Sequence, residues 1–164
     1  MKDKKASIIY AALTVIIWQF CISLSKILTN KNFFSDTKNY LFFNLTKTEN
    51  KGAAFGIFQD SSLFLGLLGV FVFIFVVYFV FKNFSFEDKA KILNASIFSA
   101  GILGNTLERL SNGYVTDFIK LTIFNFPVFN LFDILISVSV FVYIFLYLKN
   151  DFFKKGKNGN KSRN

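Results

Sequence analysis

The segment SSLFLGLLGVFVFIFVVYFVF, residues 61–81, decides the fold class because it holds no charged side chain across 21 residues. A helix needs about 20 apolar residues to cross the ~30 Å hydrocarbon core of a bilayer. Three further stretches share this character: residues 6–25 and 92–107 carry no charge, and residues 121–148 carry only Asp133. The sequence therefore predicts an all-α membrane protein, a single domain over residues 1–164.

Four transmembrane helices are expected, at about residues 6–28, 61–81, 90–109 and 128–148. The uncharged part of the third helix, residues 92–107, is shorter than a full span. Lys91 and Arg109 can lie within the span, however, because their long side chains can extend the charged ends toward the membrane surfaces. Pro127 fits the first position of the fourth helix. Alternating polar residues within 39–50 predict a small β-element on the outer side, between the first two helices.

Charge distribution predicts the orientation of the chain. With both termini in the cytoplasm, 12 of the 19 basic residues lie on the cytoplasmic side, as the positive-inside rule requires. The basic tail, residues 149–164, is expected to be disordered and to lie near anionic lipid headgroups. The net charge of +9 could suggest nucleic-acid binding, but no basic groove interleaved with aromatic residues is visible.

The residue types that are missing narrow the chemistry. The chain has no His, which excludes a Ser-His-Asp triad, a Cys-His dyad and the usual His-containing zinc sites. Its single cysteine, Cys21, cannot form an internal disulfide and is read as a packing residue. A pair of carboxylates and a Ser-Lys dyad that uses Lys26 remain, although no outer-side Ser lies in a comparably distinctive block.

Asp133 is the residue that suggests a function. An ionisable side chain inside a transmembrane segment is costly to insert and marks a functional site by default. The predicted topology places Asp117 on the same outer side. Two carboxylates in one pocket of low dielectric do not both ionise easily, so one can act as a base and the other as an acid. A structural ion pair between Asp133 and Lys26 or Arg109 is the alternative.

Several blocks of the sequence resemble the lipoprotein signal peptidase family, also called signal peptidase II. Residues 50–56, NKGAAFG, are similar to its Asn-x-Gly-Ala-Ala-Phe-Gly motif. Residues 101–119 are similar to its Gly-x-x-Gly-Asn…Asp-Arg…Gly-x-Val-x-Asp-Phe-Ile block. Residues 129–133, FNLFD, are similar to its Phe-Asn-x-Ala-Asp block, and Ser25-Lys26 matches the end of its Asp-Gln-x-Thr/Ser-Lys block. The blocks occur in the order of the family.

The resemblance implies an aspartyl endopeptidase of the bacterial inner membrane with its active site at the outer face. Its substrates would be diacylglyceryl-modified prolipoproteins, cut just before the lipidated cysteine. Asp117 and Asp133 would be the catalytic pair, with no metal and no organic cofactor. The resemblance also implies inhibition by the cyclic lipopeptide globomycin, and a monomer suffices because one chain supplies the whole site. The residues implied to support catalysis or substrate binding are Lys26, Asn50, Gly52, Asn105, Arg109 and Asn130.

The chain departs from the family pattern at three places. Ile22-Ser23 stands where the family has Asp-Gln, Glu108 replaces the Asp before Arg109, and Phe132 replaces a small Ala beside Asp133. These departures motivate an alternative, a catalytically silent membrane protein that binds lipidated prolipoprotein. A small transporter is a further alternative, which the gathering of polar residues at one membrane face disfavours.

Overall fold

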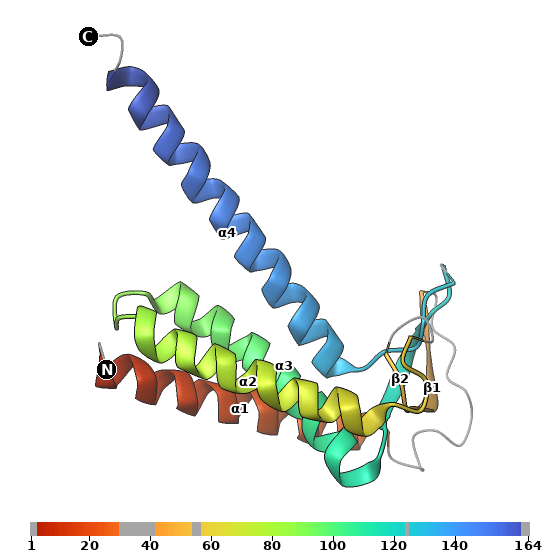
Figure 1. The fold of residues 1–164 in the computed structure, drawn as a ribbon. Coiled ribbons are helices and arrows are strands. Elements are labelled where there is room, and N and C mark those ends of the chain that lie inside the picture. Colours follow the sequence, from red (N-terminus) through yellow and green to blue (C-terminus); the bar gives the residue numbers. More distant parts are fainter. Residues whose placement is uncertain (1–2, 30–41, 54–56, 124, 162–164) are drawn as a thin grey trace.

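The computed structural model describes residues 3–29, 42–53, 57–123 and 125–161. Within these ranges, four helices and two strands follow one another (Figure 1). Their bounds are α1 Lys4–Leu28, β1 Phe43–Asn50, α2 Ser62–Asn83, α3 Lys89–Asn112, β2 Val115–Leu121 and α4 Leu131–Lys161.

Helix α3 is the centre of the fold, because it contacts α1, α2, α4 and β2. It begins after Asp88 and ends at Gly113, whose φ of 79° provides the left-handed conformation that commonly ends a helix. Its buried residues are mainly small or polar, such as Ser96, Ser99 and Ala100. Small residues let membrane helices approach closely, which explains how α3 can pack against three partners at once.

The interface between α1 and α3 combines apolar packing with hydrogen bonds. The Tyr10 hydroxyl lies 2.6 Å from the Ser99 Oγ, and the Ser96 Oγ is 3.3 Å from the Tyr10 carbonyl oxygen. Tyr10 is 2% exposed and packs in an apolar cluster with Ala6, Val80 and Ile92. The hydroxyl groups of Tyr10, Ser96 and Ser99 therefore have partners in this interface.

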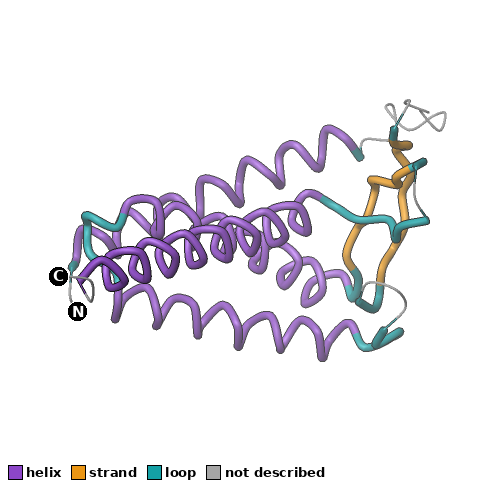
Figure 2. Tube along the Cα trace, turned by 90° about the horizontal axis from the view of Figure 1, so that it is seen from above, coloured by secondary structure: helices purple, strands orange, loops and turns teal. Residues whose placement is uncertain are grey.

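The two strands form an antiparallel sheet at one end of the helices, and the start of α1 and the end of α4 lie toward the other end (Figure 2). In its register Thr48 lies opposite Asp117 and Asn50 opposite Val115, with an irregularity between Leu45 and Thr48. A two-stranded sheet agrees with the expected β-element. The expected location was incomplete, because the second strand comes from the α3–α4 connection, where the sequence shows no regular alternation.

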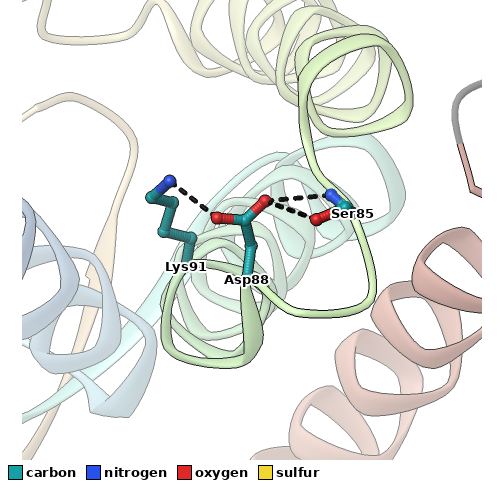
Figure 3. A network of polar contacts seen from close by, with 3 residues as sticks. All are labelled: Ser85, Asp88 and Lys91. Atoms are coloured by element: carbon teal, nitrogen blue, oxygen red, sulfur yellow. Dashed lines mark hydrogen bonds and ion pairs between the residues drawn. The ribbon is translucent and has the colours of Figure 1, made fainter.

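The connection between α2 and α3 lies at the end remote from the sheet (Figure 1). A compact polar turn holds it (Figure 3). Asp88 accepts hydrogen bonds from the Ser85 backbone N–H at 3.0 Å and from the Lys91 Nζ at 2.7 Å. The Lys91 bond is the main cause that lowers the pKa of Asp88 to about 2. Asp3, which caps α1, also accepts from the Phe86 N–H at 2.7 Å and ties α1 to this turn.

Three helices in the described part are long and apolar enough to cross a membrane, over residues 4–28, 62–83 and 131–149. The fourth predicted span corresponds to α3. It forms a helix of 24 residues, but its composition is too polar for it to count as a candidate membrane span by itself. The outward faces of the three apolar helices carry many exposed large side chains, such as Phe71 and Phe141. These faces are typical of contact with lipid.

Helix α4 differs from its prediction at both ends. It begins at Leu131, and Pro127 lies in an extended segment before it, because Phe129 pairs with Ile119 beside β2. It continues to Lys161, whereas the sequence predicted disorder from residue 149. Extending an existing helix adds one hydrogen bond per residue without a new nucleation cost, and no Pro interrupts residues 149–161. Toward its C-terminus, α4 diverges from the other helices (Figure 1).

Candidate active site

Asn130 and Asp133 form a reciprocal cap at the start of α4. The Asn130 Oδ1 accepts from the backbone N–H groups of Phe132 at 2.7 Å and Asp133 at 3.1 Å. In return, the Asp133 Oδ2 accepts from the Asn130 N–H at 3.0 Å. This pattern is a capping box, which satisfies N–H groups that have no partner within the helix. The three-residue spacing of Asn130 and Asp133 thus both starts the helix and fixes the orientation of the Asp133 side chain.

Asp117 lies on β2 and is 2% exposed. Its Oδ2 accepts from the Asn50 Nδ2 and its Oδ1 from the Asn130 Nδ2, both at 2.8 Å. Burial raises the pKa of Asp117 from its ordinary 3.8 to about 6, although these two amides act in the opposite direction. The negative charge of Asp133 also raises this pKa, so the two carboxylates sense each other.

Asn105 of α3 joins the two acids through a second route. Its Nδ2 donates to the Asp133 Oδ1 at 2.7 Å, and its Oδ1 accepts from the Asn130 Nδ2 at 3.1 Å. Asn50, Asn105, Asp117, Asn130 and Asp133 thus form one hydrogen-bonded network, called here the amide–acid cluster. Its members come from β1, α3, β2 and the α4 boundary, so the fold must be complete before the cluster exists.

Arg109 connects the cluster to the segment after β1. Its Nη2 donates to the Gly52 carbonyl at 3.0 Å, and the Gly52 N–H donates to the Asn50 Oδ1 at 3.0 Å. A Cβ at Gly52 would lie 3.0 Å from the carbonyl oxygens of Ile57 and Phe58, so this close approach requires a glycine. Arg109 therefore fixes the backbone that orients Asn50.

The alternative ion pair of Asp133 with Lys26 or Arg109 does not form. Across the described residues, the only ion pair within 4.0 Å joins Lys91 and Asp88. The Asp133 carboxylate instead takes its hydrogen bonds from Asn105 and Asn130. Arg109 still influences the cluster by charge, since it lowers the pKa of Asp117.

A cavity of about 400 Å³ opens on Asp117 from the sheet side. The residues that line it include Asn50, Gly52, Pro127 and Val128. An extended peptide could reach the Asp117 carboxylate through this opening. Within the described ranges, no group of three or more His, Cys, Asp or Glu side chains is placed to hold a metal ion.

Seven of the eight residues expected in the site lie in this hydrogen-bonded arrangement, and Lys26 does not. Lys26 is exposed in the last turn of α1 and lines a separate cavity. Part of the glycine-rich block, residues 54–56, lies outside the described residues. Sequence reasoning missed the role of Glu108, whose Oε2 accepts from the Thr116 N–H at 2.7 Å and fixes β2 one residue before Asp117. Its position directly before Arg109 was the available signal.

Phe132, the bulky departure beside Asp133, fits because of a glycine. Its side chain is 1% exposed and packs over Gly104 of α3, where any Cβ would overlap the ring. Gly101 makes similar room, since its Cβ would lie 2.8 Å from the Phe132 carbonyl oxygen. The large side chain therefore fills the α3–α4 interface and leaves the amide–acid cluster intact.

The fold and the cluster define a membrane protein with two interacting carboxylates at one end of an apolar helical bundle. The model of the family described as signal peptidase (SPase) II matches residues 10–149, and the chain belongs to this family of peptidases. Its similarity to curated and solved proteins agrees with that membership.

Among curated relatives, the lipoprotein signal peptidase of Enterococcus faecalis is 33% identical over 139 residues, covering 82% of this chain and 86% of that protein. The lipoprotein signal peptidase of Clostridium tetani is 34% identical over 121 residues, covering 71% and 76%. A solved bacterial membrane enzyme matches with a TM-score of 0.76 at 28% identity, covering 87% of this chain and 88% of that one.

Proposed function

We propose that this protein is an aspartyl endopeptidase that removes the signal peptide from diacylglyceryl-modified prolipoproteins, cutting before the lipidated cysteine. Family membership supports the substrate class, because the relatives are named lipoprotein signal peptidases. The observation that carries the catalytic assignment is the shared network: Asn130 donates to both Asp117 and Asp133.

Asp117 and Asp133 act as the catalytic pair. With one proton shared between them, the ionised carboxylate takes a proton from water as the water oxygen attacks the scissile carbonyl. The protonated carboxyl donates its proton to the carbonyl oxygen. When the tetrahedral intermediate collapses, a proton passes to the amide nitrogen, the C–N bond breaks, and a carboxylate and an amine leave. The raised pKa of Asp117 suits the proton-holding role.

The amides and Arg109 position the pair without reacting. Asn50, Asn105 and Asn130 donate to the carboxylates through their Nδ2 groups, and Asn130 also donates through its backbone N–H, so they hold each acid in one orientation. Preorganised hydrogen bonds of this kind contribute to catalysis because they need no rearrangement as charge develops.

The proposed topology has four spans across the bacterial inner membrane, with both termini in the cytoplasm. The more polar α3 crosses the membrane packed against α1, α2 and α4. The sheet and the amide–acid cluster then lie at the outer surface, where the acyl chains of a substrate can stay in lipid while its scissile bond reaches the aspartates. One chain supplies every member of the cluster, so the active unit is a monomer. Globomycin inhibits by occupying the cleft at Asp117.

The experiment that tests this function is a gel-shift assay of lipidated prolipoprotein cleavage with the purified protein, with and without globomycin. Asp117→Asn and Asp133→Asn each keep the side-chain shape but cannot supply both protonation states, so cleavage should fall below detection. Lys47→Gln, an exposed change on β1, is the control and should cleave normally. Full cleavage by either Asn variant would show that the assignment is wrong. A wild-type protein that binds the substrate without cutting it would establish the silent binding protein instead.

A further inference from the structure

A second cavity, of about 320 Å³, lies at the sheet end between α1 and α3 and shares no lining residue with the one that opens on Asp117. Helix α1 contributes Trp18, Ile22, Ser25 and Lys26 to its wall. The opposite wall comes from α3, β2 and the start of α4, and includes Phe132. The proposed peptidase mechanism makes no use of this cavity.

Two of the residues that line it, Trp18 and Ser25, carry a buried polar atom without a protein partner among the described residues. The Trp18 Nε1 and the Ser25 Oγ are buried and make no hydrogen bond within the described part of the chain. A buried donor without an acceptor costs free energy, so such groups point to a partner from outside the chain. Both can donate, as can the Lys26 ammonium beside them. The only carboxylate on the wall, that of Glu108, already accepts from the Thr116 N–H at 2.7 Å.

The order of Trp18, Ile22 and Lys26 along α1 indicates which chemical groups a ligand of this cavity would carry, and in what order. Trp18 and Lys26 are eight residues apart, which corresponds to about 12 Å along the helix. Lys26 lies in the last turn at the sheet end, Trp18 lies deeper, and the apolar Ile22 lies between them. Leu107, Phe118 and Phe132 add apolar surface opposite. A molecule that matches this order has an anionic end, hydrogen-bond acceptors and an apolar portion.

We propose that this cavity binds one anionic phospholipid through its phosphodiester and glycerol ester groups. Lys26 pairs with the phosphodiester, Ser25 and Trp18 donate to ester oxygens, and the first methylene groups of an acyl chain pack on Ile22 and Phe132. A free phosphate ion would satisfy Lys26 but would leave the apolar wall and the deeper indole without a partner. The bilayer around α1 supplies the lipid directly.

Trp18 provides the readout, because it is the only tryptophan in the chain. The full-length protein in detergent, stripped of lipid, is titrated with phosphatidylglycerol and with phosphatidylcholine of the same acyl chains while Trp18 emission is followed. Phosphatidylglycerol should bind more tightly. Lys26→Gln should weaken its binding about fivefold, the effect of one basic residue at a membrane surface. The matched control Lys120→Gln removes the same charge from an exposed site at the same end and should leave binding unchanged.

A second variant tests the cavity rather than the charge. Ser25→Leu keeps Lys26 but fills the wall and removes a donor, so it should abolish the preference for phosphatidylglycerol. Equal losses in Lys26→Gln and Lys120→Gln would overturn the proposal in favour of general surface attraction. An unchanged preference in Ser25→Leu would place the lipid elsewhere. Saturation of the emission change by inorganic phosphate alone would overturn the lipid assignment. These binding results are independent of whether the protein cleaves prolipoprotein.

Discussion

The amide–acid cluster and helix α2 differ in which side chains they bury: the cluster buries polar groups, whereas α2 leaves large apolar groups exposed. In the cluster, polar side chains leave water and find partners in one another: Asp117 and Asn130 are each 2% exposed and hydrogen-bonded. In α2, large apolar side chains remain on the outside, as at Leu67 and Phe71, which are 56% and 68% exposed. The difference teaches that a substitution in the cluster must break a partnership, whereas one on the outer face of α2 only exchanges one lipid contact for another.

The largest expected effect is the pH dependence of the buried acid. Asp117 binds its proton more tightly in the folded protein, with a pKa of about 6, than in the unfolded chain, near 3.8. It therefore favours the folded state at low pH, and this contribution is lost as pH rises from about 4 to above 6. The loss is at most about 3 kcal/mol.

Thermal melting in detergent at several pH values, with wild type and Asp117→Asn side by side, measures this effect. Between pH 4 and pH 7.5 the wild type should lose stability relative to the variant. A difference between the two proteins that stays constant with pH would show that Asp117 does not titrate in this range.

Next in size is the loss of a link inside the cluster. Asn105→Ala removes the donor to Asp133 and the acceptor of Asn130 while leaving both acids in place. A hydrogen bond to a charged group contributes about 1.5–3 kcal/mol, so the cleavage rate should fall roughly 10- to 100-fold. The rate of lipidated prolipoprotein cleavage checks this expectation, with Leu93→Ala, an exposed residue of α3 that lines neither cavity, as the matched control. Equal rates in the two variants would contradict a role for the amide.

A smaller effect is expected below the cluster, where α3 meets α4. Gly104→Ala places a methyl group against the Phe132 ring, and overpacking of this kind costs about 1–3 kcal/mol. The double variant Gly104→Ala/Phe132→Ala should recover part of the loss, because the smaller side chain makes room for the new methyl group. Melting temperatures of the single and double variants form a double-mutant cycle. Additive effects at these two positions would contradict their contact.

The smallest effect belongs to the outer face of α2. Phe71→Leu changes an exposed apolar side chain into another, and its effect on stability should stay within about 0.5 kcal/mol. Gly69 on the same helix provides the contrast, because a Cβ there would clash with Thr106 of α3, and Gly69→Ala should lower the melting temperature. If Phe71→Leu were the more damaging of the two, the assignment of the α2 faces would be wrong.

The four helices were predictable because long uncharged stretches have few other structures available. The polar residues of the site were predictable as a set, because the blocks around Asn50, Asn105, Asp117 and Asn130 resemble the motifs of the family. The contacts between distant segments were not predictable. Local sequence patterns do not reveal that β2 pairs with β1 or that the Glu108 carboxylate accepts from the Thr116 N–H. The start of α4 was misplaced because Pro127 is a common first helical residue, while the cap made by Asn130 and Asp133 determines the actual start.

The central position of α3 has a consequence for biosynthesis. Asn130 and Asp133 are synthesised after α3 and β2, and until then Asn105 and the close-packing positions Gly101 and Gly104 lack their partners from the start of α4. A nascent chain stopped before residue 130 would thus carry Asp117 without the second acid. Such a chain would be inert toward membrane proteins, since peptide hydrolysis by the proposed pair needs the second acid, which lies at the start of α4.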